Sequence, residues 1–426
     1  MKARKLTCIT AMTLSAVLAL PVSLEAQEQH NNEHSRYRVK DLGTLGGTFS
    51  FAGGMNNRGE VEGLSTLPGD TAKHAYLWRK GRMIDLGTLG GPNSGGAWRP
   101  SDSGEVGGAS DTSTPDPLGQ DFCGFGTNLI CLPFVWHNGV MTPLPTLGGS
   151  NGIANGFNNR GQVVGRAENT TPDQTCEPPT EIPEFKAVIW EDGEIEKELP
   201  TLSGEPDGRA FAINDRGEAI GLSGNCTTKV HAVLWQNDTV TDLGNLGGTS
   251  TFPSDINNRG QVVGQSDLRG DATTHAFLWQ KGMMTDLGTL PGDFASAADG
   301  INGKGQVVGI SFDIDFNGRA FLWQHGVMTD LNTLIPRDSP LFLIEASGTI
   351  NSSGQIAGIA LQTSTGEFHA FLATPREEES GAESATPAVL GATSQSPKVL
   401  LPENVRTMLR QRLTWRRFGA ALMKRQ

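Results

Sequence analysis

The sequence predicts an all-β fold, a seven-bladed β-propeller of four-stranded blades whose ring is closed by the N-terminal strand. Three short phrases recur seven times each, in fixed order, across residues 37–373. Successive copies lie 43 to 57 residues apart, which is about the length of one propeller blade. Gly makes up 55 of the 426 residues, about twice the usual share of roughly 7 %, as a chain of many short strands and turns requires.

Residues 1–26 have the pattern of a secretory signal peptide. Three basic residues open the segment, residues 6–22 are apolar, and Ala26 offers a small residue for cleavage. An uncleaved membrane helix is the alternative, but the apolar run is shorter than the about 20 residues that a bilayer requires. We therefore expect a secreted, periplasmic or extracellular protein with no transmembrane segment after the signal.

Each repeat can be divided into four strands. In the third copy, residues 150–157 form the expected first strand, an Asn-Asn-Arg-Gly turn follows, and residues 162–165 form the second. In the fifth copy, His-Ala-Phe-Leu-Trp at 275–279 is the third strand and residues 283–287 are the fourth. Asn and Gly supply the positive backbone angles of a tight hairpin. A β-helix needs fewer residues per turn, and no 3.6-residue period indicates helical repeats. The seven hairpin glycines are Gly59, Gly104, Gly161, Gly217, Gly260, Gly305 and Gly354.

The two ends of the array complement each other. A fourth-strand phrase at 39–43 precedes the first repeat, whereas no fourth strand follows the last third-strand phrase at 369–373. An N-terminal strand that completes the last blade would close the ring without an unpaired seam. An open solenoid, the alternative, would be expected to have two atypical capping repeats.

The phrases His-Ala-Phe-Leu-Trp, Asp-Leu-Gly-Thr-Leu-Gly-Gly and Asn-x-x-Gly-Gln-Val-Val-Gly resemble the HAF family of extracellular repeats. The resemblance covers about 337 of the 426 residues. It implies export and a repeat domain, and it provides no catalytic residues to transfer. The sequence departs from the pattern at 132–136 (Leu-Pro-Phe-Val-Trp), at 186–190 (Lys-Ala-Val-Ile-Trp) and at Ala373, which replaces the Trp.

Repetition favours structural roles for the most conspicuous side chains. His74, His231, His275 and His369 begin equivalent strands, whereas an active site needs a single constellation. The Gly-rich phrases lack the Gly-Lys-Thr/Ser ending of a nucleotide-binding loop. Six tryptophans end third strands and are expected to pack between blades, namely Trp78, Trp136, Trp190, Trp235, Trp279 and Trp323.

After the signal the chain has four cysteines, Cys123, Cys131, Cys176 and Cys226, as a disulfide set in an oxidising compartment would. Three pairings are possible, and we favour Cys123–Cys131 within one loop and Cys176–Cys226 between neighbouring blades, because neither crosses the ring. No cysteine has the spacing of a zinc site. All four lie in links between second and third strands, on one face of the ring, where binding residues usually gather.

The same links are acidic. Because residues 1–26 carry +2 and residues 404–426 carry +7, the remainder of the chain carries −21. A field of that sign excludes nucleic acid and disfavours anionic lipid as partners. The acidic loop residues are candidates for Ca²⁺ or a cationic partner, with solvated loop charge as the alternative. They are Asp111, Asp116, Asp121, Asp173, Glu177, Glu181 and Glu184.

A second candidate for Ca²⁺ lies in the sixth repeat, where Asp313, Asp315 and Asn317 copy the first half of a calcium-binding loop. Gln324 stands in the place of the bidentate Glu, so the required ligand set is only half present. No other cofactor is predicted.

Four residues of the innermost strands differ from their equivalents in other repeats, namely Trp98, Arg99, Asp255 and Asp299. An aromatic ring, a cation and two carboxylates at one mouth of the channel would suit sugar binding or acid–base work. Packing peculiar to each blade is the alternative.

The C-terminal part differs in composition from the repeats. Residues 374–403 are rich in Glu, Ser, Ala, Thr and Pro and read as a disordered linker. Residues 404–426 hold seven basic and no acidic residues and form a candidate helix with Asn404 as its cap. This segment could bind a membrane surface, dock on the acidic propeller or an anionic envelope partner, or stay disordered until bound.

Two classes of function fit these observations. One is a secreted binding or interaction scaffold that presents its looped acidic face to a glycan, a protein or a cell-envelope surface. The other is an extracellular polysaccharide hydrolase or lyase, which requires clustered carboxylates. The sequence leaves the oligomeric state open.

Overall fold

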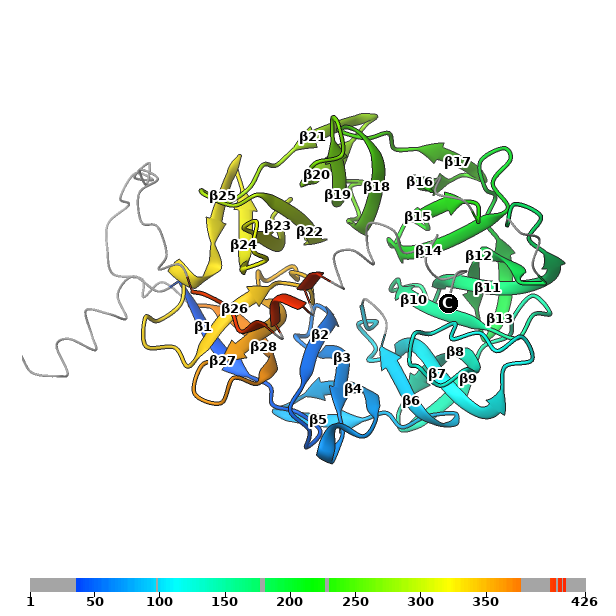
Figure 1. Cartoon of the computed structure of the whole chain (residues 1–426), viewed down its shortest axis with the longest axis horizontal. Helices are drawn as coiled ribbons and strands as arrows, with labels where there is room; N and C mark the ends of the chain where they lie inside the picture. Colours follow the sequence, from blue (N-terminus) through cyan, green and yellow to red (C-terminus); the bar gives the residue numbers. More distant parts are fainter. Residues whose placement is uncertain are drawn as a thin grey trace, which may run out of the picture.

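Seven four-stranded antiparallel sheets surround a common axis in the computed structural model (Figure 1). The structure describes residues 36–96, 99–176, 181–226, 230–376, 399–403, 405–407 and 409–410. The predicted seven-bladed β-propeller is therefore confirmed. The predicted signal peptide lies outside the described residues. No helix among the described residues is long and apolar enough to cross a membrane.

The blades follow one another along the chain, each from its innermost to its outermost strand. Blade 1 comprises β2 (Ser50–Met55), β3 (Val61–Thr66), β4 (Lys73–Arg79) and β5 (Arg82–Asp85), and blade 2 comprises β6 (Gly90–Gly96), β7 (Val106–Pro115), β8 (Leu129–His137) and β9 (Val140–Pro143). Blade 3 comprises β10 (Gly152–Phe157), β11 (Val163–Pro172), β12 (Pro183–Glu191) and β13 (Glu194–Glu198), and blade 4 comprises β14 (Asp207–Ile213), β15 (Ala219–Gly224), β16 (Val230–Gln236) and β17 (Thr239–Asp242). Blade 5 comprises β18 (Gly247–Ile256), β19 (Val262–Leu268), β20 (Thr274–Gln280) and β21 (Met283–Asp286), and blade 6 comprises β22 (Ala295–Ile301), β23 (Val307–Phe312), β24 (Gly318–Gln324) and β25 (Val327–Asp330). Blade 7 comprises β26 (Leu341–Glu345), β27 (Ile356–Gln362), β28 (Phe368–Pro375) and the N-terminal β1 (Tyr37–Asp41).

Helical structure is sparse. Two short 3₁₀ helices, η1 (Pro68–Asp70) and η2 (Leu331–Thr333), lie in links, and residues 403, 405–407 and 409–410 are helical near the C-terminus. The second-to-third-strand links and the links between blades emerge on one side of the ring, which we call the looped face. The hairpins between first and second strands and between third and fourth strands form the opposite turn face.

The Asn-x-x-Gly hairpins on the turn face also hold neighbouring blades together. In blade 1 the Asn56 Oδ1 atom accepts the backbone N–H groups of Arg58 and Glu60, both at 3.0 Å, and Gly59 adopts φ +75°. The Asn56 Nδ2 group donates to the Ser101 carbonyl of blade 2 at 2.9 Å. Five further turn asparagines donate in the same way to the next blade, namely Asn158, Asn214, Asn257, Asn302 and Asn351. Each bond satisfies buried polar groups that would otherwise cost about 1–3 kcal/mol.

The hydrophobic cores lie between blades rather than within them. Ile220 and Leu234 of blade 4, for example, pack with Ile256 and Phe277 of blade 5. The tryptophans take the predicted packing position, and the Trp190 indole N–H also donates to the Pro145 carbonyl of the preceding link at 2.9 Å. Each blade therefore depends on both neighbours for its buried surface.

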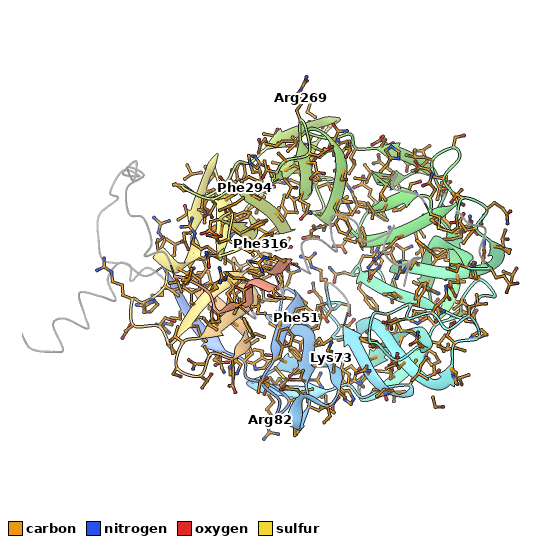
Figure 2. All side chains as sticks on the ribbon, in the orientation of Figure 1. Phe51, Lys73, Arg82, Arg269, Phe294 and Phe316 are labelled. Atoms are coloured by element: carbon orange, nitrogen blue, oxygen red, sulfur yellow. A yellow bond between two sulfur atoms is a disulfide. The ribbon has the colours of Figure 1, made fainter. Side chains whose placement is uncertain are left out.

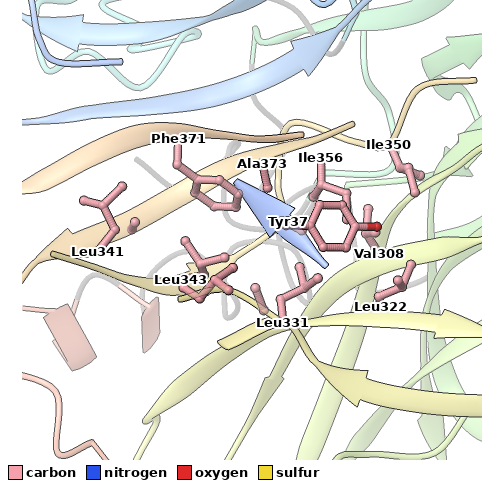
Figure 3. Close-up of a cluster of buried hydrophobic side chains, with 14 residues drawn as sticks. Tyr37, Val308, Leu322, Leu331, Leu341, Leu343, Ile350, Ile356, Phe371 and Ala373 are labelled. Atoms are coloured by element: carbon pink, nitrogen blue, oxygen red, sulfur yellow. The ribbon is translucent and has the colours of Figure 1, made fainter. Parts of the chain in front are cut away.

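Strand β1 closes the ring by pairing with β28, from Tyr37 opposite Pro375 to Asp41 opposite Phe371. The Tyr37 side chain is buried among Leu331, Leu343 and Phe371 (Figure 3). These contacts complete the core between blades 6 and 7. The predicted closure by the N-terminal strand is thus confirmed.

In four blades the second residue of the third strand is bonded to the carboxylate that ends the fourth strand. His74 contacts Asp85 and His275 contacts Asp286, with Nδ1–Oδ1 distances of 2.8 and 2.9 Å. At the closure the pair joins the two ends of the array, because His369 belongs to β28 and Asp41 to β1, at 2.8 Å. The hydrogen bond that His369 donates to the Asp41 carboxylate raises the pKa of His369. Burial would raise the pKa of Asp41, but the hydrogen bonds from His369 and from the Gly43 N–H leave it lowered. The repeated histidines are accordingly structural.

We predict that His369→Gln lowers the free energy of unfolding by about 0.5–1 kcal/mol at pH 5.5 and has little effect at pH 8.5. A raised His pKa stabilises the fold fully below about 6.5 and is lost as the pH rises through the folded-state value. The lowered Asp41 pKa sets the acid limit, since that contribution is lost as the pH falls below about 4. Urea unfolding at both pH values measures the effect, with the exposed His137→Gln as control. An equal loss at both pH values would contradict this account.

Candidate functional site

The two longest links are fixed on the looped face by both predicted disulfides. Cys123 is bonded to Cys131 within the blade 2 link, and Cys176 of blade 3 is bonded to Cys226 of blade 4. Asp173 lies near the second pair, but the bond between the two sulfurs already explains this grouping of potential metal ligands. The links are therefore cross-linked to the scaffold at its most elaborated sector.

Most acidic residues predicted in these links accept hydrogen bonds from the links themselves. The Asp116 carboxylate accepts Leu118 N–H at 2.9 Å and Asn151 Nδ2 at 2.8 Å, and it is buried. Similar bonds engage Asp111 with Asn93 and Thr127, Asp121 with Gly126, Asp173 with Thr175, and Glu184 with Lys186. Glu181 is exposed, and Glu177 lies outside the described residues. These carboxylates shape the loops.

The four predicted inner-strand residues are partly brought together. The Asp255 carboxylate, on β18, accepts Ile256 N–H at 2.8 Å and Ile301 N–H at 3.0 Å, so it bridges blades 5 and 6. Burial raises the pKa of Asp255, and the charge of Arg99 opposes that shift. Asp299, in the next blade, is also fully buried, and Trp98 lies outside the described residues. Arg99 and Asp255 thus interact electrostatically, while the Asp255 oxygens serve the backbone.

The predicted calcium-binding turn holds the C-terminal segment. Asp313 Oδ1 accepts the backbone N–H groups of Asp315 and Asn317, both at 3.0 Å, and Asn317 Nδ2 also donates to this carboxylate. The remaining amide oxygen, Asn317 Oδ1, accepts Leu401 N–H at 2.9 Å. Protein donors suffice to shape this turn, and the calcium site stays a prediction.

The C-terminal segment docks through apolar contacts. Leu401, Val405 and Leu409 are 1 %, 0 % and 0 % exposed and share one cluster with residues of blades 6 and 7. Val405 and Leu409 are four residues apart and so lie on one side of the helical turns, and Leu401 lies just before the helical residues. Arg410 lies over the Phe316 ring at 5.3 Å and pairs with Glu403 of its own helix. Figure 1 shows this segment in red beside β26 and β28, close to the ring axis.

The inner-strand residues that lie five positions before the hairpin Asn, or before Ser101 in blade 2, form a set near the ring axis that we call the rim. Phe51, Ile153, Arg209 and Phe252 occupy it in blades 1, 3, 4 and 5 and are partly exposed. Figure 2 shows Phe51 on the axis side of the ring, whereas Arg82 and Arg269 lie at its outer edge. In blades 6 and 7 the position is buried, and Ala297 belongs to the cluster that holds the C-terminal segment.

Arg209 breaks the pattern of this rim. Its guanidinium lies over the Phe211 ring at 4.7 Å, and the Phe211 ring lies 4.6 Å from that of Phe252. Burial lowers the pKa of Arg209 to about 10. The inner-strand residues predicted from the sequence lie two or three positions before the hairpin and do not include Arg209. In the sequence, Arg209 is the single cation at the rim position, where the other blades have aromatic, aliphatic, Gly or Ala residues.

Arg166, on the second strand of blade 3, is a buried neighbour of this cation. It is 1 % exposed, lies over Phe122 at 4.2 Å and Phe185 at 5.1 Å, and donates to the Phe122 carbonyl at 3.3 Å. Burial and the charge of Arg209 lower its pKa, while Glu168 and Asp207 oppose the shift. Because Phe122 precedes Cys123, the blade 2 disulfide loop covers this guanidinium. Arg166 is therefore enclosed by the protein, unlike Arg209.

Glu62 is a second departure from the repeat. It is fully buried on β3, and neither carboxylate oxygen has a hydrogen-bond partner among the described residues. Burial raises its pKa well above the usual range. Its carboxylate fills space beside Gly96, where a side chain would be only 1.9 Å from Oε2. Equivalent positions are aliphatic in blades 3 to 6, with Val164, Ile220, Val263 and Val308.

No family model and no curated protein matches this chain. Solved structures with a similar arrangement include a mutant puromycin hydrolase complexed with PGG, with a TM-score of 0.48 and 14 % identity, covering 76 % of this chain and 54 % of that one. A puromycin-hydrolysing peptidase of Mycobacterium tuberculosis has a TM-score of 0.40 and 12 % identity, with coverage of 79 % and 53 %. This chain thus spans about half the length of both. A gluconolactonase of Xanthomonas campestris has a TM-score of 0.36 and 8 % identity, with coverage of 80 % and 92 %.

We predict that Glu62→Gln raises the free energy of unfolding by about 1–3 kcal/mol at pH 8 and changes it little at pH 4. The folded state keeps a proton that the unfolded chain loses above about pH 4.3, so stability falls as the pH rises. Gln does not titrate, so the substitution removes this decrease in the free energy of unfolding with pH. Urea unfolding from pH 4 to 8 tests it, with the exposed Glu194→Gln as control. A pH dependence unchanged from that of the original chain would refute the prediction.

We also predict that Leu409→Asp releases the C-terminal segment from blades 6 and 7. A buried, unpaired carboxylate is disfavoured, so the apolar surface under the segment becomes exposed. Fluorescence of the dye ANS should rise several-fold for this variant. Thr407→Asp, on the exposed side of the same helical turns, should leave it unchanged. Equal fluorescence of the two variants would argue against apolar docking.

Proposed function

We propose that this protein is a secreted binding scaffold whose looped face recognises an extracellular ligand. The observation that carries the proposal is the restriction of the largest departures from the repeat to that face. The links of blades 2 and 3 are long, cross-linked and internally hydrogen-bonded, whereas the turn face repeats one hairpin design. Loops fixed on a rigid scaffold are a common way to build a binding surface.

Secretion is part of the proposal. Both disulfides are consistent with an oxidising compartment, such as the periplasm or the cell exterior. The resemblance of the repeats to HAF extracellular repeats agrees with this location. A glycan, a protein or a cell-envelope surface would each be encountered there.

Binding is favoured over hydrolysis by the state of the inner-strand carboxylates. A glycoside hydrolase of the usual kind needs two carboxyl groups that flank the scissile bond. Asp255 is committed to two backbone N–H groups and Asp299 is buried in the next blade, which is a poor arrangement for acid and base work on a polymer. The acidic loop residues likewise serve loop structure.

We expect the mature protein to bind at least one member of a glycan array without hydrolysing it. A variant with Cys123→Ser and Cys131→Ser should bind at least tenfold more weakly while the ring still unfolds cooperatively, because a loop without its disulfide must lose conformational freedom on binding. The matched control is Ser364→Ala, at an exposed turn of blade 7 on the same face. Turnover of a bound glycan, or binding unaffected by loss of the disulfide, would contradict the proposal.

A further inference from the structure

We propose that the rim beside blades 3 to 5 binds a saccharide bearing a carboxylate, with the Arg209 guanidinium as its anion partner. The inference rests on the proposed function and specifies the chemistry of its ligand. Its basis is the placement of one cation in an apolar rim at the inner edge of the looped face.

The charge of Arg209 is the first feature that supports an anionic ligand. The structure gives this side chain neither a salt bridge nor a side-chain hydrogen bond to another described residue, and its Nε atom is buried without a partner. Arg319, near the start of a third strand, is compensated by contrast, since it pairs with Asp293 at 2.7 Å and Asp330 at 3.3 Å. A partly buried charge without a counter-ion is costly, and an incoming anion would remove that cost.

The residues around Arg209 also suit such a ligand. Arg209 lies on β14, and Ile153 of β10 and Phe252 of β18 occupy the same strand position in the flanking blades and are partly exposed. The Arg209 guanidinium lies over the Phe211 ring at 4.7 Å, and this contact restricts its movement. A planar guanidinium suits a planar carboxylate, which it can bind through two parallel hydrogen bonds.

The surroundings of Arg209 favour a saccharide with few charges. Partly exposed Ile153 and Phe252 offer apolar surface on either side of the cation, and the apolar face of a sugar ring packs well on such side chains. The chain without residues 1–26 and 404–426 carries a net charge of −21. This negative charge repels densely charged anionic polymers. A mainly neutral oligosaccharide with a single uronic acid satisfies both conditions.

The C-terminal segment limits where such a ligand can lie. Leu401, Val405 and Leu409 cover the corresponding rim of blades 6 and 7, where Ala297 is 1 % exposed. In blades 3 to 5 the rim residues Ile153, Arg209 and Phe252 are partly exposed. Among the described residues, the segment therefore covers the rim of blades 6 and 7 and not the Arg209 sector.

The experiment compares two trisaccharides that differ only at the terminal sugar, glucuronate in one and glucose in the other. Calorimetric titration of the full mature chain at pH 7 should give at least about tenfold tighter binding for the glucuronate form, the range of a charge-assisted hydrogen-bonded pair. Arg209→Gln should remove that preference, and Arg209→Lys should keep only part of it. Arg269→Gln, at the exposed outer edge of blade 5, is the matched control and should behave as the original chain.

Removing an uncompensated cation should leave the ring folded, and thermal unfolding of each variant checks this. Should Arg209→Gln fail to fold, the comparison of the two trisaccharides on the original chain and on Arg209→Lys still decides. Equal binding of both sugars, or a glucuronate preference that survives Arg209→Gln, would overturn the inference. If another glycan binds and depends on the Cys123–Cys131 loop but not on Arg209, the inference fails and the proposed function stands. If no array member binds the mature protein, both fail.

Discussion

Asp41 and His369 lie 328 positions apart in the chain, and their side chains meet where β1 completes the sheet of blade 7. The pairing of these two strands is the constraint on which the other parts of the ring depend. Every hydrophobic cluster between blades needs a neighbour on each side, and a ring open at one seam would expose the cluster around Tyr37. The belt of turn asparagines follows the same circle, since Asn351 donates to the Asn56 carbonyl across the closure. Closure therefore joins backbone pairing, apolar burial and side-chain hydrogen bonding at a single place.

In such a ring, residues that repeat from blade to blade and residues that depart from the repeat have different roles. Residues that recur in six of the seven blades, such as the hairpin Asn and the third-strand Trp, hold blades together. Exceptions need a local reason, and the structure supplies it for several. Asp116 organises a disulfide-bonded loop, Asn317 holds the C-terminal segment, and Glu62 fills the space left by Gly96. Arg209 is an exception for which the described residues provide no salt-bridge partner, and this is why it indicates a ligand.

The looped face is consequently divided into two sectors. Over blades 6 and 7 the chain covers its own apolar surface with Leu401, Val405 and Leu409. Over blades 2 to 4 it builds long cross-linked links around partly exposed rim residues. The acidity of those links contributes mainly to their internal structure, because Asp111, Asp116 and Asp173 are buried with donors from nearby turns. Net charge alone is therefore a poor guide to what this face recognises.

The sequence by itself determined the number of blades, the four strands of each and the closing role of β1, because these follow from local turn chemistry and from the phase of the repeat at its two ends. It also indicated both disulfides, since residues in neighbouring links of one face can be paired without crossing the ring. It could not show that the C-terminal segment docks on blades 6 and 7, because that contact depends on which apolar side chains the ring leaves uncovered. Nor could it show that the Asp255 oxygens accept backbone N–H groups while the Arg209 guanidinium has no salt bridge among the described residues. The compensation of a charge is a property of neighbours distant in sequence, and only the tertiary structure decides which side chains those are.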